Sequence, residues 1–278
     1  LYEFPVKEYF VEEAFTISGF TDSSISEMIK FPAEKDLFPE FGGFSVSLTS
    51  AALIGMNRGF SFYNSNPYFC LEQRASAFLL MISSGKLLKE FSFKPPDDKS
   101  YDFDHIEKLF LGELGDFRNA DGGFRLWKER QLFRGEMSDP YLTSYVIFVL
   151  VTAKNKGYDV DSDILNGAVS FLRKYMKDPP KDGYSYILES LSFINYTFAI
   201  SGIKDDSISK LLVEKRKQLS LRGNGFLALS LAIQRDVKKY QDDRDIKSIM
   251  DTFKNSMEIT TRKIMFKDRG DGAYRRAY

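Results

Sequence analysis

From about Ser50 onward, the sequence is a succession of helix-length segments joined by short polar links, and this pattern restricts most of the chain to a helical fold. Several of these segments carry broad apolar stripes, as residues 142–150 do. Short links between successive helices favour antiparallel neighbours that stack as αα-hairpins. The predicted helices span residues 50–63, 71–89, 103–117, 139–156, 162–177, 186–201, 206–219, 223–236 and 241–257.

Local signals mark several helix ends. Ser138-Asp139-Pro140 combines a capping side chain with a proline that suits a first helical turn, so we expect a helix to begin there. Gly157 and Gly202 are expected to end two helices, and Asp161 or Ser162 to begin another.

The predicted helices are too many for the core of one four-helix bundle, so we predict a mainly α fold, an α/α toroid of stacked helical hairpins. A closed toroid of about six hairpins needs about twelve helices. We therefore expect either that the C-terminal helices are missing from this chain or that some of the predicted ranges each combine two neighbouring helices. The turns at 121–124 and 182–184, which lie about 61 residues apart, each precede a long helix and form a weak internal repeat.

Residues 1–44 differ from the rest, because short β-rich segments alternate there with turn signals such as Thr21–Ser24. Residues 44–48 alternate apolar and polar side chains, which is typical of a strand. We therefore divide the chain into strands of a flanking β domain at 1–44 and a helical domain at 45–278. The first part is too small to be stable alone, and the chain does not begin with methionine, so we expect it to come from a longer polypeptide.

Charge and composition exclude several kinds of partner. The 39 basic and 39 acidic side chains balance, so nothing favours nucleic acid or an anionic membrane. The apolar runs are far shorter than the ~18 residues of a membrane span. One cysteine excludes a disulfide framework, and one cysteine with one histidine gives zinc ligation little support. We expect no metal and no cofactor.

The stretch Asn66-Pro67-Tyr68-Phe69-Cys70-Leu71-Glu72-Gln73 contains the only cysteine. A thiolate at Cys70 could attack the side-chain amide of Gln73 and expel ammonia, which would leave an internal thioester. Because a thiol has a pKa of about 8.5, it leaves far more readily than an amine, so a nearby amine or hydroxyl could take the acyl group.

The flanking residues suit such a bond. Tyr68 and Phe69 could shield it from water, and Cys70 is expected at a helix N-terminus, where backbone N–H groups and the helix dipole would stabilise a thiolate. Glu72 could serve as a partner of the helix dipole or as part of the site. The alternative is an inert buried thiol beside a surface amide.

Residues 63–73, with their core Pro-Tyr-x-Cys-Leu-Glu-Gln, resemble the thioester region of the alpha-2-macroglobulin and complement family, above all its bacterial members. The resemblance covers roughly residues 5–260. It continues at residues 43–53, 119–124 and 142–145, at Trp127, and at residues 165–172, 218–221 and 228–229.

This resemblance implies a thioester domain, an α/α toroid inserted in a β-sandwich domain of CUB type. The intact protein would be a much longer, broad-range protease inhibitor that reacts once and is not a turnover enzyme. A protease would cleave a bait region elsewhere in the chain, and the exposed thioester would acylate lysine amines of that protease. Bacterial members are periplasmic and commonly lipid-anchored to the inner membrane.

One departure from the family concerns histidine. Some complement-type members carry a histidine near the thioester that assists transfer to hydroxyls, whereas residues 182–186 here contain none. The only histidine, His105, lies in another predicted helix, and we expect it to be structural or exposed. Amines should therefore be the preferred nucleophiles.

Two other functions stay open. An α/α-toroid enzyme of the terpene cyclase or prenyltransferase kind would need an acidic cluster or zinc ligands. Asp97-Asp98, Asp205-Asp206 and Asp242-Asp243 are available, but each pair stands where an aspartate serves as a helix cap. The turn at Asp121-Gly122-Gly123-Phe124 is expected to be structural. The third possibility is an interaction module without a thioester.

Overall fold

The computed structural model divides the chain into two units, Leu1–Ile54 and Gly55–Tyr278. The described residues of the first unit form no strand, and most of the strands predicted there lie outside them. The predicted helix at 50–63 also lies outside the described residues, and the predicted boundary after residue 44 stays a prediction. The structure describes residues 21–26, 28–29, 43–44, 46, 70–90, 103–128, 137–177, 184–259 and 264–267.

The second unit is mainly α-helical, with one short hairpin near its end. In the hairpin, Met257 pairs with Phe266 in antiparallel register. The α-helices are α2 (Leu71–Glu90), α3 (Phe103–Glu107), α4 (Pro140–Asn155), α5 (Ser162–Lys177), α6 (Tyr184–Ile200), α7 (Asp206–Lys215), α8 (Leu221–Gln234) and α9 (Arg244–Asn255). A π-helix η2 (Lys108–Gly112), the 3-10 helices η3 (Leu114–Phe117), η5 (Arg216–Gln218) and η6 (Tyr240–Asp242), and the strands β1 (Met257–Ile259) and β2 (Ile264–Phe266) complete the described elements.

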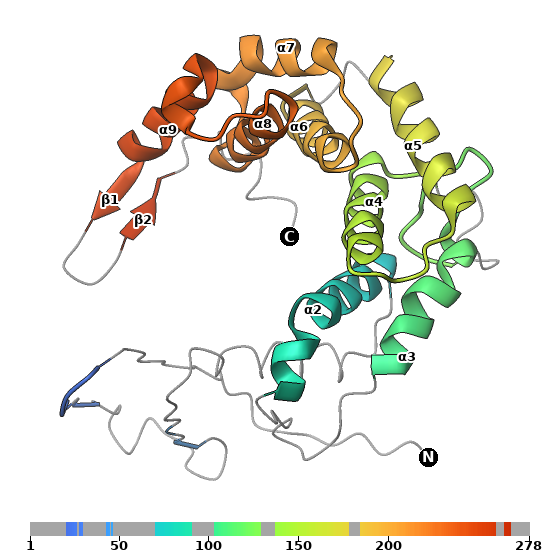
Figure 1. Ribbon diagram of the computed structural model, residues 1–278, viewed down its shortest axis with the longest axis horizontal. Coiled ribbons are helices and arrows are strands. Elements are labelled where there is room, and N and C mark those ends of the chain that lie inside the picture. Colours follow the sequence, from blue (N-terminus) through green and yellow to red (C-terminus); the bar gives the residue numbers. More distant parts are fainter. Residues whose placement is uncertain are drawn as a thin grey trace, which may run out of the picture. The chain divides into compact units, whose positions relative to one another are not determined.

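The helices form two layers (Figure 1). In one layer α2 packs against α4, α4 against α6, and α6 against α8. In the other layer α3, α5, α7 and α9 each pack against the helix that precedes them in the chain. This alternation is that of successive αα-hairpins laid side by side, so the predicted mainly α fold of stacked helical hairpins is confirmed.

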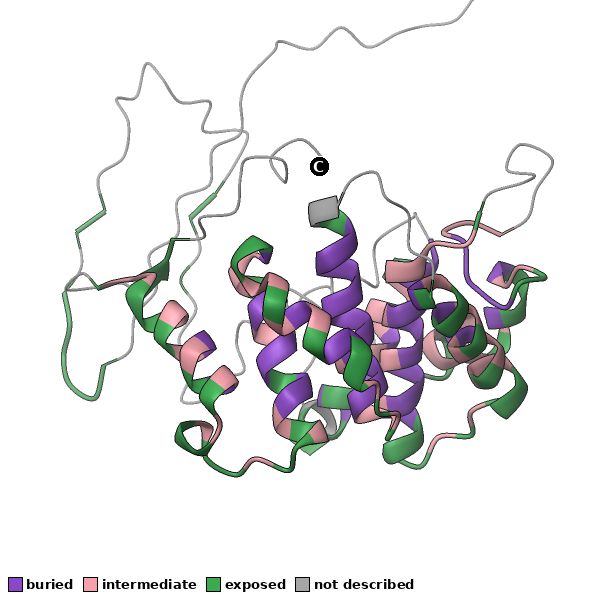
Figure 2. Ribbon diagram, turned by 90° about the horizontal axis from the view of Figure 1, so that it is seen from above, coloured by how far each residue is buried: buried purple, intermediate pink, exposed green. Residues whose placement is uncertain are grey.

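The first layer is buried on more than one side, and Figure 2 shows its helices largely in purple. In α4 the buried residues include Ser144, Val146, Val149 and Val151, which together cover more than half of the circumference of the helix. The outer helix α5 is amphipathic and buries only Ala168, Leu172 and Met176. Within the described part of the chain, no helix is long and apolar enough to cross a membrane.

Five predicted helices, at 71–89, 139–156, 162–177, 186–201 and 223–236, agree with α2, α4, α5, α6 and α8 to within two residues at each end. The residues predicted to begin and end these helices have the expected roles. Asp139 accepts a hydrogen bond of 2.6 Å from the backbone N–H of Leu142 and so caps α4. Asp161 accepts one of 2.8 Å from the N–H of Asp163 and caps α5. Gly157 and Gly202 follow helix ends with φ of +89° and +75°.

Three predicted helices were wrong in extent. Residues 103–117 do not form one helix but three short pieces, α3, η2 and η3. Gly112 and Gly115 weaken the helix, and the backbone hydrogen bonds change from the α-helical pattern to the π-helical and then to the 3-10 pattern. Residues 206–219 leave the α-helix after Lys215. Residues 241–257 begin their α-helix only at Arg244, since Asp243 is its cap, and residue 257 already belongs to β1.

Polar side chains tie the inner helices together. The Glu189 carboxylate, 3% exposed on α6, accepts hydrogen bonds from the backbone N–H and the hydroxyl of Ser220, at 2.5 and 2.9 Å. Ser220 also caps α8, so this contact fixes the start of α8 on α6. A methyl group at Gly223 would lie 2.7 Å from both carboxylate oxygens, so only glycine allows this approach.

Asn195 forms a second such tie, between α6, α7 and α8. Its amide nitrogen donates to the hydroxyls of Ser209 and Ser230 at 3.2 and 2.8 Å. Its oxygen accepts a hydrogen bond of 3.2 Å from the amide of Gln234. Asn195 is 1% exposed, so water cannot replace these partners.

We expect Asn195→Ala to lower the free energy of unfolding by roughly 2–3 kcal/mol, because it leaves several buried polar groups without partners. Chemical denaturation followed by circular dichroism measures the change. Ser170→Ala is the matched control, since the exposed Ser170 hydroxyl bonds only to the carbonyl of Asn166 on its own helix. Equal unfolding free energies for the two variants would contradict the assigned role of Asn195.

Candidate functional site

Cys70 lies immediately before α2 and is 7% exposed. Two backbone hydrogen bonds fix the start of the helix. The N–H of Leu71 donates to the carbonyl of Leu126 at 2.9 Å, and the N–H of Arg74 donates to the carbonyl of Cys70 at 3.1 Å. Cys70 is therefore held at the helix N-terminus, with Gln73 in the first turn.

Burial raises the pKa of the Cys70 thiol above its ordinary value. Backbone N–H groups of Gln73 and Glu72 point to the sulfur and lower this pKa, while the negative charge of Glu72 raises it. The net effect is the opposite of the stabilised thiolate that we expected from the helix N-terminus. The N–H groups are present as predicted, but the loss of hydration outweighs them.

The structure places the other predicted site residues as follows. The side chain of Gln73 is half-buried, and its Oε1 atom is buried with no hydrogen-bond partner among the described residues. Glu72 is exposed in the first turn of α2. Tyr68 and Phe69 lie outside the described residues, so their shielding role stays a prediction, as does the joining of Cys70 to Gln73.

A cluster of charged side chains adjoins this turn, and sequence reasoning missed it. We call Arg74, Glu113, Asp116 and Lys128 the Glu113 ion network. Arg74 donates to the Glu113 carboxylate at 2.5 Å and to the carbonyl of Leu109 at 2.8 Å. Lys128 donates to the same Glu113 oxygen at 2.6 Å and lies 2.8 Å from Asp116.

Hydrogen bonds from Lys128 and Arg74 lower the pKa of Glu113. Hydrogen bonds to Asp116 and Glu113 raise the pKa of Lys128. The pairs therefore remain charged over a wider pH range than isolated side chains would. No sequence pattern indicated this network, because its members lie up to 54 residues apart (128 − 74) on different elements.

The segment Asp121–Phe124 forms a tight turn, as the sequence predicted, and contacts both α4 and α5. Gly122 has φ of +90°, and a side chain there would collide with the backbone of Gly167 in α5. Phe124 is fully buried, and its N–H donates to the hydroxyl of Thr143 in α4 at 2.9 Å. This turn leads directly into Leu126, which holds the start of α2.

The remaining candidates carry structural roles. His105 is exposed on α3, in agreement with the expectation for it. Asp205 and Asp243 cap α7 and α9 through their side chains, as expected, whereas Asp97-Asp98 lies outside the described residues. Within the described ranges, no three His, Cys, Asp or Glu side chains gather as a metal site would require.

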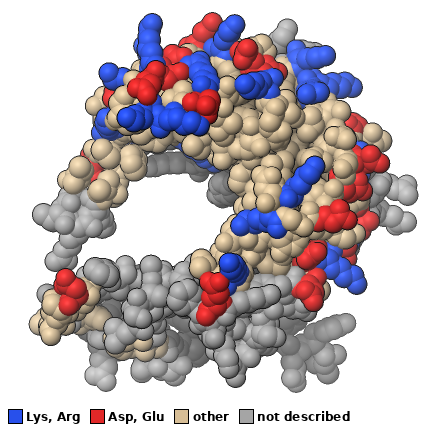
Figure 3. Space-filling model, in the orientation of Figure 1, with Lys and Arg blue, Asp and Glu red and all other residues tan. Residues whose placement is uncertain are grey.

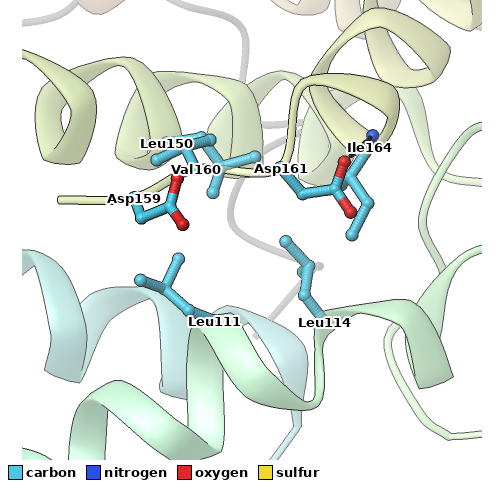
Figure 4. Close-up of a pocket in the computed structure, with 7 residues that line it drawn as sticks. All are labelled: Leu111, Leu114, Leu150, Asp159, Val160, Asp161 and Ile164. Carbon is cyan, nitrogen blue, oxygen red and sulfur yellow. Dashed lines mark hydrogen bonds between the residues drawn. The ribbon is translucent and has the colours of Figure 1, made fainter.

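A pocket of about 330 Å³ lies elsewhere, between the segment after α3 and the loop before α5 (Figure 4). Its wall combines aliphatic side chains with two carboxylates, one of which, Asp161, caps α5. Neither Cys70 nor Gln73 contributes to it. The lining residues are Leu111, Leu114, Leu150, Asp159, Val160, Asp161 and Ile164.

Comparisons with curated proteins identify three relatives, although no protein-family model matches the chain. The alpha-2-macroglobulin of Rickettsia conorii is 28% identical over 141 residues, which is 50% of this chain and 7% of that protein. The alpha-2-macroglobulin homolog of Yersinia pestis is 30% identical over 139 residues, 49% of this chain and 6% of that protein. That of Escherichia coli K12 is 31% identical over 118 residues, 41% of this chain and 6% of that protein.

Solved structures of bacterial alpha-2-macroglobulins share the fold. Native Escherichia coli alpha-2-macroglobulin, from domain MG7 to the C-terminus, matches with a TM-score of 0.58 and 22% identity over 72% of this chain and 32% of that chain. Salmonella alpha-2-macroglobulin reacted with methylamine matches with a TM-score of 0.59 and 19% identity over 74% of this chain and 13% of that chain.

The chain thus spans no more than 7% of the curated relatives that it matches, which makes it similar to one region of much longer proteins. The resemblance to the alpha-2-macroglobulin family is confirmed: this chain is similar in sequence to bacterial alpha-2-macroglobulins and shares the fold of part of their C-terminal region.

Proposed function

We propose that this chain is the thioester-containing part of a bacterial alpha-2-macroglobulin-like, broad-range protease inhibitor. The observation that carries the proposal is the position of Cys70 and Gln73, which occupy the start and the first turn of α2 in a chain homologous to alpha-2-macroglobulins. The inhibitor reacts once with each target and does not turn over. The bait region and the remaining domains belong to other parts of the longer protein.

The chemistry has two steps. In the first, the Cys70 thiolate attacks the amide carbon of Gln73, ammonia leaves, and the thioester forms. In the second, a lysine amine of the protease attacks the same carbon, a new amide forms, and the Cys70 sulfur leaves and takes up a proton. Protease and inhibitor are then joined through the side chain of residue 73.

The burial of Cys70 supports this proposal. A dry environment penalises the charged thiolate but not the neutral thioester, so the site that raises the thiol pKa also favours the joined state. The bond would then persist until a conformational change lets a nucleophile enter.

The structural relatives support a protease as partner and an amine as nucleophile. One of them is a Salmonella alpha-2-macroglobulin that had reacted with methylamine. Others are Escherichia coli alpha-2-macroglobulins activated by trypsin and by porcine elastase. By analogy, the full-length form of this protein would meet proteases in the periplasm, anchored to the inner membrane.

An α/α-toroid enzyme is the weaker alternative. The acidic residues that such an enzyme would use, Asp205 and Asp243, accept hydrogen bonds from the backbone N–H groups of the helices they cap. A module that has lost its thioester remains the second alternative, and the mass measurement below separates it from the inhibitor.

The intact mass of the purified chain tests the thioester. We expect the chain to be one ammonia lighter than its sequence and to resist alkylation at Cys70. Methylamine should convert residue 73 to an N-methyl amide, which makes the chain one CH2 group heavier than its sequence, and should release the thiol. Cys70→Ala is the control and should show the full sequence mass.

An unreacted amide at residue 73, together with a freely alkylated Cys70, would overturn the proposal. Thioester lost to water during preparation gives a different product, because hydrolysis leaves a carboxylate instead of an amide. Peptide mass spectrometry at residue 73 therefore separates a bond that never formed from one that was hydrolysed.

The nucleophile preference gives a further test. His105 lies on α3 and is exposed, and no histidine occurs at residues 182–186. Without an imidazole to activate a hydroxyl, methylamine should react far faster than glycerol at equal concentration. Equal rates of transfer to both, measured by mass spectrometry, would contradict this expectation.

The released thiol should react with a shifted pH dependence. Because burial raises the pKa of Cys70, the thiolate fraction should keep rising at pH values above the ordinary thiol range of about 8.5. Iodoacetamide alkylation of the methylamine-treated chain, followed from pH 7 to 10, measures this. A rate that levels off below pH 8.5 would show that the helix N-terminus outweighs burial.

A further inference from the structure

The first turn of α2 belongs to a closed circuit of contacts. Leu71 bonds through its N–H to Leu126, and the side chain of Lys128, two residues further on, reaches Glu113. Glu113 holds the guanidinium of Arg74, whose own N–H bonds to the carbonyl of Cys70. The circuit therefore begins at Leu71, between the two residues of the predicted reactive pair, and returns through Arg74 to the carbonyl of Cys70.

We propose that the Glu113 ion network is a positioning device that holds the Cys70–Gln73 turn closed against water and small reagents. This inference rests on the proposed function for its purpose, although the constraint itself exists whether or not the thioester has formed. Its members touch neither reacting atom in the contacts described, and they act through the backbone of Arg74 and of Leu126.

The burial of Arg74 makes the network effective, although its partners are partly exposed. The Arg74 side chain is 9% exposed, and besides Glu113 and Leu109 its guanidinium lies 5.2 Å from the centre of the Phe117 ring. Lys128 lies 5.8 Å from the same ring. Removing one partner from such a group leaves a charge without compensation, and the neighbouring chain must then rearrange to hydrate it.

The network differs from other ion pairs of the described chain in its buried cation, since Arg74 is 9% exposed and Arg235 is 40% exposed. On the face shown in Figure 3, basic and acidic side chains are interspersed over the surface, where single pairs contribute little. Arg235 pairs with Asp243 and Asp245 at 2.7 and 3.0 Å, and it joins the end of α8 to the start of α9, with no contact to α2. It offers a matched control.

The test measures access to the free thiol. The methylamine-treated or hydrolysed chain is alkylated with iodoacetamide at pH 8. The alkylation rate at Cys70 and the unfolding midpoint are measured for each variant, so that a change in the rate can be compared with the change in stability. We expect Glu113→Gln and Lys128→Met to react about tenfold faster than the natural chain, because each loosens the local structure around the turn. Lys128→Arg should restore the slow rate, since it keeps both ion pairs.

Arg235→Gln also takes one cation from two carboxylates, but away from α2, so it should leave the Cys70 rate unchanged whatever its effect on the unfolding midpoint. If Cys70 is alkylated at the same rate in the network variants as in Arg235→Gln, once differences in unfolding midpoint are taken into account, the positioning role is overturned. The same holds if Lys128→Met matches the natural chain. Lys128→Met serves as a second variant in case Glu113→Gln does not fold.

A second measurement connects the network to the thioester. In a chain that retains the bond, Glu113→Gln should also hydrolyse about tenfold faster, as thiol release shows. If residue 73 of the untreated natural chain is an unmodified glutamine, the proposed function alone is overturned, because the alkylation rates do not depend on the thioester. If the untreated natural chain contains the thioester, but the network variants and the natural chain are alkylated at the same rate after methylamine treatment, the positioning role alone is overturned.

Discussion

The inner helices α2, α4, α6 and α8 are packed on more than one side, and this constraint determines the rest of the described fold. A helix covered on several sides must be apolar around most of its circumference, and every polar group that it carries needs a partner inside. Asn195 and Glu189 meet that requirement through contacts to α7 and α8. The outer helices need only one apolar stripe, because their other faces meet water.

The same packing shapes the candidate site. At the start of α2 the side chains of Cys70 and Leu71 are buried and the backbone of Leu71 bonds to Leu126, whereas a helix N-terminus in water would favour a thiolate. Burial then acts on Cys70 more strongly than the backbone N–H groups do. A neutral thioester tolerates such a place better than a thiolate, so the packing that stabilises the fold would also preserve a latent acyl group.

The residues near Cys70 divide into two kinds. Gln73 and Cys70 are those on which the proposed chemistry depends, and they are neighbours in sequence. Arg74 and its carboxylate partner Glu113 are those that hold the turn, and they come from elements that are distant in sequence. The proposed reactivity therefore depends on residues that are close in sequence, whereas the proposed protection of the Cys70–Gln73 turn depends on the tertiary structure.

The sequence by itself determined the mainly α fold, the extent of five helices and the placement of Cys70 and Gln73 on one helical turn. These features depend on local interactions, namely helix propensity, capping by Asp139 or Asp161 and the glycines that end helices. The alternation of apolar and amphipathic helices would also have predicted the two layers, since it follows from the number of faces that each helix buries.

Only the tertiary structure decided the division of residues 103–117 into three pieces, the Glu113 ion network and the direction of the Cys70 pKa shift. Each depends on groups that are brought together from separate segments, so no local pattern encodes it. Desolvation in particular is the sum of all neighbours around an atom, and it reversed the effect that the helix N-terminus alone would have had on the thiol.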